Sequence, residues 1–127
     1  MDDKKILVID DDPTAVKDVR AALEQAGYNV YSVNTAEGVL EKLKEVNPDL
    51  IILDLVLAHE SGFKVAKEIK ANIKYKDTPI IIVSLRKDDI DKRVAALSGA
   101  AEYLEKPVNP EALLFHVNDI LSRKENP

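Results

Sequence analysis

Three runs of apolar residues in this chain each stop abruptly at a polar residue. They are Ile6–Ile9 before Asp10, Leu50–Leu53 before Asp54, and Ile80–Val83 before Ser84. Uniformly apolar runs of this length are typical of parallel strands buried on both faces. Because parallel strands place their carboxyl ends at one edge of a sheet, the pattern predicts that Asp10, Asp54 and Ser84 meet there.

Segments with helical periodicity alternate with these runs. In the first helix, Asp12 is the predicted N-cap, Pro13 takes the first helical position and Gly27 ends the helix. The second helix ends before Pro48, and the fifth opens at Asn109-Pro110. The predicted apolar stripes, in chain order, are Val16, Val19, Leu23 and Ala26; Val39, Leu40, Leu43 and Val46; Phe63, Val65, Ala66, Ile69 and Ile73; Ile90, Val94 and Leu97, before Gly99; and Leu113, Val117, Ile120 and Leu121.

Two further strand-like segments, Tyr28–Val33 and Ala101–Leu104, are less apolar. Strand-like and helical segments therefore alternate five times, which predicts an α/β fold with a parallel sheet. Placing the two weaker strands at the edges gives a doubly wound, flavodoxin-like (βα)5 sheet of order 2-1-3-4-5. Its switch point lies between the first and third strands, where Asp10, Asp11 and Asp54 are predicted to lie.

The composition is that of an ordinary globular domain. With 127 residues, 46% hydrophobic and 32% charged, residues 1–127 are expected to form a single domain. The absence of cysteine excludes disulfides and thiolate chemistry. We expect a cytoplasmic protein that contacts no membrane, since neither a signal peptide nor a membrane-spanning stretch is present. A net charge of −5 with interspersed signs argues against direct binding to nucleic acid.

The carboxylates indicate a divalent cation. Several carboxylates held close together repel one another and must either keep a proton or recruit a cation. Mg²⁺ suits one or two carboxylates, a backbone carbonyl and a phosphate oxygen. Helix capping is the alternative explanation for Asp10–Asp12, but one aspartate suffices for a cap. Asp54 interrupts an otherwise apolar stretch with no turn signal after it.

Ser84 and Lys106 complete a set suited to phosphoryl chemistry. Taken alone, the serine could simply bond nearby backbone, and a lysine before a proline is usually exposed. Beside the carboxylates they have defined tasks, because an ammonium pairs with a phosphoryl oxygen and a hydroxyl donates to another. The first hypothesis is therefore metal-assisted phosphoryl transfer.

Together these residues resemble the receiver domain of two-component response regulators, the family of the stand-alone chemotaxis receiver. The likeness covers nearly the whole chain, and its motifs are Asp10-Asp11, Asp54 with Gly62 eight residues on, Ser84 after Pro79–Val83, and Gly99–Pro107. The resemblance implies that Asp54 accepts a phosphoryl group from the phosphohistidine of a sensor histidine kinase or a histidine phosphotransfer protein.

The resemblance also implies a role for each site residue. Mg²⁺ would be held by Asp11, Asp54 and the carbonyl of Val56, and by Asp10 through water, while Lys106 would clamp the phosphate and Ser84 would bond it. As switch residues, Ser84 would move toward the phosphate and Tyr103 would turn inward. This would reshape the surface of the fourth helix, fifth strand and fifth helix. The Lys106-Pro107 peptide would be cis.

Three residues depart from the family's usual pattern. Leu85 stands where a small residue is usual, so its bulk beside the phosphate is expected to slow the access of donor or water. Val56 replaces polar or longer side chains, and Ala58 stands where proline is common. These departures affect the expected kinetics. His59 is interpreted as a solvated loop residue and His116 as a partly buried one.

Other functions remain as alternatives. A degenerate receiver would keep the fold as a constitutive protein-binding module that is never phosphorylated. Asp10–Thr14 also resembles the first motif of haloacid-dehalogenase-type phosphatases, with Asp10 as the nucleophile, but that family's later acidic pair has no counterpart after Lys106. A flavodoxin is disfavoured, because Asp11–Pro13 replaces the phosphate loop that a flavin requires.

The sequence leaves the wider context open. The last helix is expected to end near Ser122, so no output domain is expected within this chain, which is either a stand-alone receiver or an excised piece. The cognate kinase, the downstream protein and the signal are not encoded in any motif. A monomer and a phosphorylation-dependent dimer are both compatible with the helix faces.

Overall fold

The computed structural model describes residues 3–125, and within that range strands and helices alternate as the sequence predicts. The strands of the main sheet are β1 (Lys5–Ile9), β2 (Asn29–Val33), β3 (Leu50–Leu53), β6 (Ile80–Ser84) and β7 (Glu102–Glu105). The helices are α1 (Pro13–Gln25), α2 (Val39–Val46), α3 (Gly62–Ala71), α4 (Asp89–Leu97) and α5 (Pro110–Glu125). A short hairpin, β4 (Val56–Leu57) and β5 (Glu60–Ser61), lies between β3 and α3 and was not predicted.

The main sheet confirms the predicted strand order. Its five strands run β2-β1-β3-β6-β7, and every neighbouring pair is parallel. The switch point lies between β1 and β3, where Ile9 is paired with Leu53. The residues that follow this pair, Asp10 and Asp54, therefore leave the sheet side by side.

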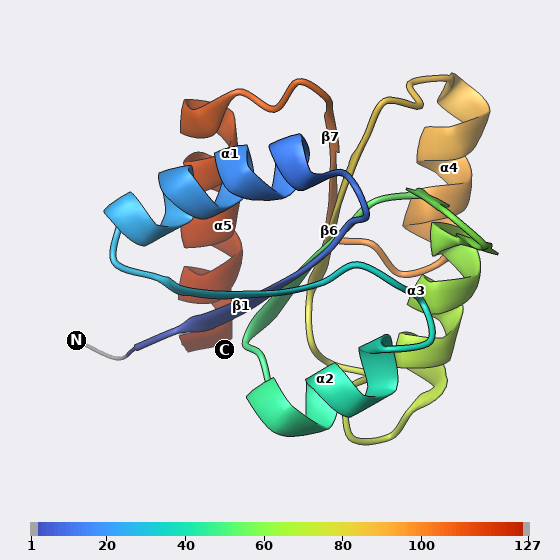
Figure 1. The fold of residues 1–127 in the computed structure, drawn as a ribbon, viewed down its shortest axis with the longest axis horizontal. Helices are drawn as coiled ribbons and strands as arrows, with labels where there is room; N and C mark the ends of the chain where they lie inside the picture. The colour runs from blue at the N-terminus through green and yellow to red at the C-terminus, as the bar shows by residue number, and fades with distance from the viewer. Residues whose placement is uncertain (1–2, 126–127) are drawn as a thin grey trace.

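Helices cover both faces of the sheet. Figure 1 shows α1 and α5 on one side of the strands and α3 and α4 on the other. Alternate residues of β1 enter two separate cores: Ile6 and Val8 pack with α1 and α5, while Leu7 and Ile9 pack with α2 and α3. The central strands β1, β3 and β6 are buried on both faces because of this double cover.

The predicted helix ends are confirmed at α1 and at the start of α5. The Asp12 side chain accepts a hydrogen bond from Thr14 N at 3.0 Å, and Gly27 follows the helix with a φ of 97°. Asn109 Oδ1 accepts from Ala112 N at 3.0 Å at the start of α5. The prediction that α5 ends near Ser122 was wrong, since the helix continues to Glu125. Residues 126–127 lie outside the described range.

The predicted inward face of α4 was wrong. Ile90 is 75% exposed, Val94 36% and Leu97 81%, whereas Asp91 and Ala95 are buried. The apolar residues lie four and three positions apart, as on the buried face of an amphipathic helix, but this stripe faces away from the sheet. The helix instead packs through small Ala95 and through Asp91, whose charge is paired.

Three other residues predicted to face the core are exposed. Ala26 is the C-cap of α1, where the chain is already leaving the helix. Leu40 is 48% exposed at the groove between α2 and α3, and Ile73 is 84% exposed because it lies beyond the end of α3. Across residues 3–125, none of the helices is long and apolar enough to cross a membrane.

Candidate functional site

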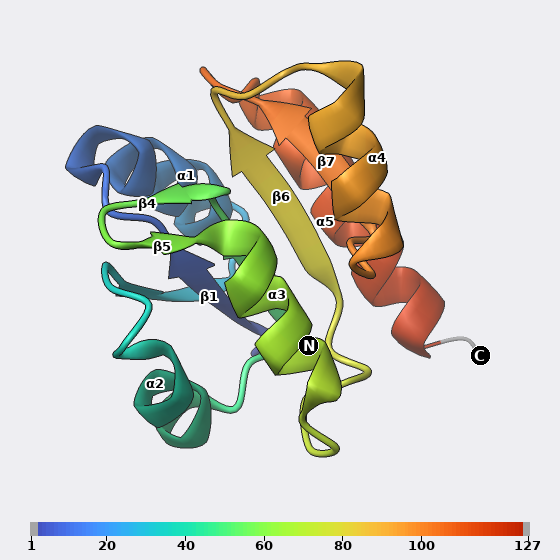
Figure 2. The ribbon, with the colours of Figure 1, turned by 90° about the vertical axis from the view of Figure 1, so that its right-hand side faces the viewer.

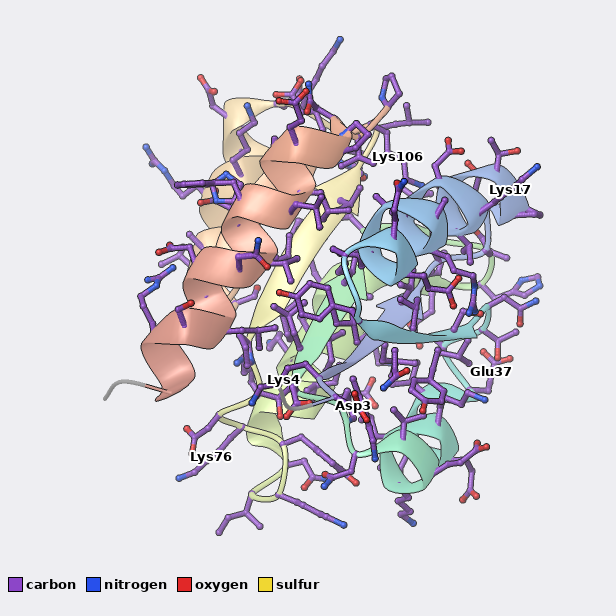
Figure 3. The ribbon with its side chains drawn as sticks, turned by 90° about the vertical axis from the view of Figure 1, so that its left-hand side faces the viewer. Asp3, Lys4, Lys17, Glu37, Lys76 and Lys106 are labelled. Carbon is purple, nitrogen blue, oxygen red and sulfur yellow. The ribbon has the colours of Figure 1, made fainter. Side chains whose placement is uncertain are left out.

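Four predicted site residues lie together at the carboxyl edge of the sheet. Asp10 follows β1 and Asp54 follows β3, while Ser84 is the last residue of β6. Ser84 is paired with Glu105 on β7, so Lys106 leaves the edge strand at the same level. Lys106 lies near the start of α5 in Figure 3. The parallel register alone therefore brings residues from across the chain to one point.

Lys106 binds both acidic strand ends. Its Nζ lies 2.8 Å from Asp10 Oδ2 and 2.9 Å from Asp54 Oδ2. All three side chains are less than a tenth exposed. A buried ammonium shared by two carboxylates balances part of their charge, and one negative charge of the trio remains uncompensated.

The remaining carboxylate oxygens of the two aspartates are held by backbone amides. Asp54 Oδ1 accepts a hydrogen bond from Val56 N at 3.1 Å, and Asp10 Oδ1 accepts from Asp12 N at 2.9 Å. In each carboxylate, one oxygen therefore accepts a hydrogen bond from a backbone amide and the other is paired with the Lys106 ammonium. These bonds fix the orientation of both carboxylates.

The surroundings of this trio raise the pKa of both Asp10 and Lys106. Burial raises the pKa of Asp10, and the nearby charge of Asp54 raises it further, against the opposing hydrogen bonds from Lys106 and Asp12. Burial by itself would lower the pKa of Lys106, but hydrogen bonds to Asp10 and Asp54 outweigh it and the pKa is raised. Lys106 is therefore a cation at neutral pH.

A third carboxylate completes a set of hard oxygen donors. One carboxylate oxygen from each of Asp10, Asp11 and Asp54 lies within 4.8 Å of the others, and Asp11 is exposed to solvent. Mg²⁺ prefers oxygen ligands and keeps several of its waters, so two buried carboxylates with one open side fit this ion. Val56, whose carbonyl is the other predicted ligand, lies at the start of β4 beside this group.

Gly62 allows a tight turn behind Asp54. A Cβ at this position would lie 2.2 Å from the Asp54 carbonyl oxygen and 2.6 Å from Leu55 Cα, which only glycine avoids. Gly62 N also donates to the Leu55 carbonyl at 2.8 Å. The β4–β5 hairpin runs directly into α3 in Figure 2, so this contact fixes the start of α3 against the backbone of Asp54.

Ser84 and Tyr103 lie in a second cluster next to the acidic one. Ser84 is fully buried, and its Oγ accepts a hydrogen bond from Arg86 N at 3.2 Å. The Tyr103 hydroxyl donates to the Arg86 carbonyl, so this ring is directed inward and partly buried. Arg86 Nη2 in turn lies 2.9 Å from Asp91 Oδ1. The sequence pattern did not single out Arg86 and Asp91, because one charged residue in a loop and one on a short helix give no distinguishing signal.

Three smaller predictions are confirmed. The Lys106-Pro107 peptide is cis. His59 is exposed in the turn of the β4–β5 hairpin, and the His116 side chain is 27% exposed, with Nδ1 3.4 Å from Glu102 Oε2. The predicted effect of Leu85 on access to the site stays a prediction, and the structure places this side chain at the surface, 70% exposed.

The chain is similar in sequence to two bacterial proteins of different length. It is 34% identical over 122 residues to the alkaline phosphatase synthesis transcriptional regulatory protein PhoP of Bacillus subtilis, covering 96% of this chain and 50% of that protein. It is 30% identical over 118 residues to protein PilH of Pseudomonas aeruginosa, covering 93% of this chain and 98% of that protein. The chain thus spans about half the length of PhoP and almost all of PilH.

Solved structures and a family model point the same way. The chemotaxis protein CheY4 of Vibrio cholerae superposes with a TM-score of 0.86 at 30% identity, over 93% of this chain and 98% of that one. The DrrB receiver domain gives a TM-score of 0.85 at 33% identity, over 95% and 99% of the two chains. Residues 6–118 match the model of the response regulator receiver domain. This chain belongs to the response regulator receiver domain family of two-component signalling.

Proposed function

We propose that this receiver domain, taken as residues 1–127, accepts a phosphoryl group on Asp54. The observation that supports this role most directly is the contact between Lys106 Nζ and Asp54 Oδ2 at 2.9 Å inside the acidic cluster. A carboxylate that attacks an anionic donor needs positive charge beside it. Lys106 supplies that charge in a buried position, where screening by water is weak.

The chemical step is an exchange of bonds at phosphorus. A carboxylate oxygen of Asp54 attacks the phosphorus of a donor phosphohistidine, the P–N bond breaks, and the imidazole leaves with its electron pair. Lys106 pairs with a phosphoryl oxygen and the Ser84 hydroxyl donates to another. Hydrolysis reverses the modification when a water oxygen bonds to phosphorus and the Asp54 oxygen leaves. The domain positions these groups and is otherwise no enzyme.

Asp10, Asp11, Asp54 and the Val56 carbonyl are the proposed holders of Mg²⁺, with Asp10 acting through water. The clustered carboxylate oxygens and the open side at Asp11 support this assignment. When bound, the ion neutralises charge on the carboxylates and on the incoming phosphoryl oxygens. Asp10 contributes by holding Lys106 in place, and the amide of Val56 contributes by orienting Asp54.

The proposed output is a change at the surface formed by α4, β7 and α5. Ser84 ends β6 and Tyr103 lies on β7, and both are bonded to the same residue of the β6–α4 loop. The proposed partners are a sensor histidine kinase or histidine phosphotransfer protein and a downstream protein, in the cytoplasm. Neither nucleic acid nor membrane is a proposed direct partner, and the domain acts as a monomer or a phosphorylation-dependent dimer.

The test is intact mass after incubation with acetyl phosphate, with and without Mg²⁺. We expect a Mg²⁺-dependent gain of one phosphoryl group in the wild type and none in Asp54→Asn. Asp49→Asn is the matched control, because Asp49 is also an aspartate beside β3 but bonds to Lys5 N at the opposite end of the sheet. This control should gain the same mass as the wild type.

Two other outcomes would replace the proposal. Mg²⁺ binding without any mass gain from acetyl phosphate or phosphorylated kinase would favour the constitutive binding module. A mass gain that survives Asp54→Asn but not Asp10→Asn would favour the phosphatase-like alternative, in which Asp10 is the nucleophile.

A further inference from the structure

Arg86, in the loop between β6 and α4, is held at three points. Its amide donates to Ser84 Oγ at 3.2 Å, its carbonyl accepts from the Tyr103 hydroxyl, and its guanidinium Nη2 lies 2.9 Å from Asp91 Oδ1. Ser84 comes from β6, Tyr103 from β7 and Asp91 from α4. One loop residue therefore joins both proposed switch residues to α4.

The ion pair between Arg86 and Asp91 holds the loop residue in this position. The Asp91 side chain is 7% exposed, whereas that of Arg86 is 54% exposed. A carboxylate buried to this degree requires a cation or several donors, so Asp91 holds Arg86 more strongly than an exposed acid would. Asp91 also lies in the first turn of α4, where the helix dipole favours a negative charge. Asp91 is thus fixed by its place on the helix, and it holds the Arg86 side chain of the loop.

The position of Tyr103 depends on that loop. Its hydroxyl is bonded to a backbone carbonyl, and a carbonyl can act as a fixed acceptor only if its own peptide is held in place. The Arg86 peptide is held on the amide side by Ser84 and on the side-chain side by Asp91. The inward position of Tyr103 therefore depends on the bonds that hold the Arg86 peptide.

We propose that Arg86 and Asp91 are positioning residues of the switch, whose ion pair holds the Arg86 carbonyl in the place where the Tyr103 hydroxyl bonds to it. This inference rests on the proposed function of Ser84 and Tyr103. A carbonyl that is held in place gives the inward Tyr103 ring a fixed partner, so the arrangement that contains this bond is more populated. Breaking the ion pair should weaken that arrangement and leave the acidic cluster intact.

The first measurement uses the unmodified protein. NMR of the protein carrying ¹³C-labelled tyrosine reports the environment of the Tyr103 ring. We expect Asp91→Asn to move the Tyr103 signals toward those of a solvent-exposed ring, and Arg86→Lys to leave them near the wild-type position because the charge pair is kept. Asp119→Asn is the control, since it removes the same charge from the exposed Arg123–Asp119 pair on α5.

The second measurement is the binding of beryllium fluoride with Mg²⁺, a mimic of a phosphoryl group on a carboxylate. We expect the apparent Kd to rise about fivefold in Asp91→Asn, while Mg²⁺ alone binds with unchanged affinity. Arg86→Lys should keep most of the wild-type affinity because it keeps the charge pair, whereas loss of affinity in both variants would indicate a general structural defect. Arg86→Gln is the second variant in case the buried substitution fails to fold, because the Arg86 side chain is half exposed.

The two measurements separate this inference from the function on which it rests. Tyr103 signals and beryllium fluoride affinity that both stay at wild-type values in Asp91→Asn and Arg86→Gln would overturn the positioning role. A wild type that gains no phosphoryl group from any donor would overturn the proposed function. Displacement of Tyr103 in the variants would still support the positioning of that ring by Arg86.

Discussion

Lys106 Nζ lies 2.9 Å from Asp54 Oδ2, although 52 residues separate the two in the chain. The contact spans β6, because Asp54 follows β3 and Lys106 follows β7 on its far side. A long, flexible side chain is needed to cross that strand, and burial then removes its freedom. The Lys106 ammonium is therefore placed to pair with negative charge at Asp54, whether that charge belongs to the free carboxylate or to a phosphoryl group on it.

Lys106→Met should tighten Mg²⁺ binding. The ammonium repels a cation at the same carboxylates, and a unit charge about 4 Å away contributes on the order of 1 kcal/mol or more even in water, so we expect the Kd for Mg²⁺ to fall at least about fivefold. Isothermal titration calorimetry measures this. Lys92→Met removes an exposed ammonium that pairs with Glu105, and it should leave the Kd unchanged. Weaker binding in Lys106→Met would contradict the electrostatic balance described for the site.

Gly62→Ala should lower the free energy of unfolding by about 2 kcal/mol or more, because the new methyl group meets the rigid backbone of Asp54 and Leu55. Urea denaturation measures the change. Gly38→Ala is a matched control at another helix start, where the two nearest atoms belong to the side chains of Val33 and Thr35 and the backbone is farther away, so its loss should be smaller. Equal decreases in the free energy of unfolding in the two variants would mean that the backbone near Asp54 shifts to make room for the methyl group.

Glu105→Gln should lower the Tm near neutral pH and have no effect in strong acid. The hydrogen bond from Lys92 lowers the pKa of Glu105, so the stabilisation is present above the unfolded pKa near 4.5 and is lost as the pH falls through the lower folded value. Thermal melts of both proteins between pH 7 and pH 2.5 measure the difference in Tm.

Glu68→Gln, on the exposed face of α3, is the control for that series because it removes the same charge. At pH 7, the Tm difference between Glu68→Gln and the wild type should be smaller than the difference between Glu105→Gln and the wild type. A difference for Glu105→Gln that grows as the pH falls would contradict the sign worked out from the lowered pKa.

Leu85→Ala should speed phosphoryl loss from Asp54 if the leucine restricts access to Ser84 and the site. Because the side chain is 70% exposed, its removal should change the free energy of unfolding by less than about 0.5 kcal/mol, so a kinetic change is not a stability effect. The decay of the phosphorylated mass with time measures the rate. A lifetime equal to that of the wild type would mean that Leu85 leaves the path of water open.

The order of the sheet and the position of the acidic site could be predicted from the sequence for one reason. Buried parallel strands are apolar on both faces, so their ends and their central position are visible in the residue pattern, and the parallel register then forces Asp10 and Asp54 together. Lys106 could be placed beside them because β7 had already been assigned to the edge next to β6.

Apolar patterning led to a wrong prediction where tertiary contacts decide which face of a helix is buried. The stripe of Ile90, Val94 and Leu97 has the spacing of a buried face, yet α4 turns it outward and buries Asp91, whose charge is neutralised by Arg86. A residue pattern carries no record of a partner that lies in a loop. The β4–β5 hairpin was missed because strands of two residues are too short to show any period.

The parallel register has a consequence for folding. Asp10, Asp54 and Lys106 follow three strands that are distant in sequence, so the charge cluster exists only once β1, β3, β6 and β7 are assembled side by side. A ligand of these carboxylates binds that assembled state and not a chain in which one of these strands is missing from the sheet, and its binding energy therefore stabilises the four strands together. Occupancy of this one small cluster thus reports the assembly of four strands that span the chain from its first strand to its last.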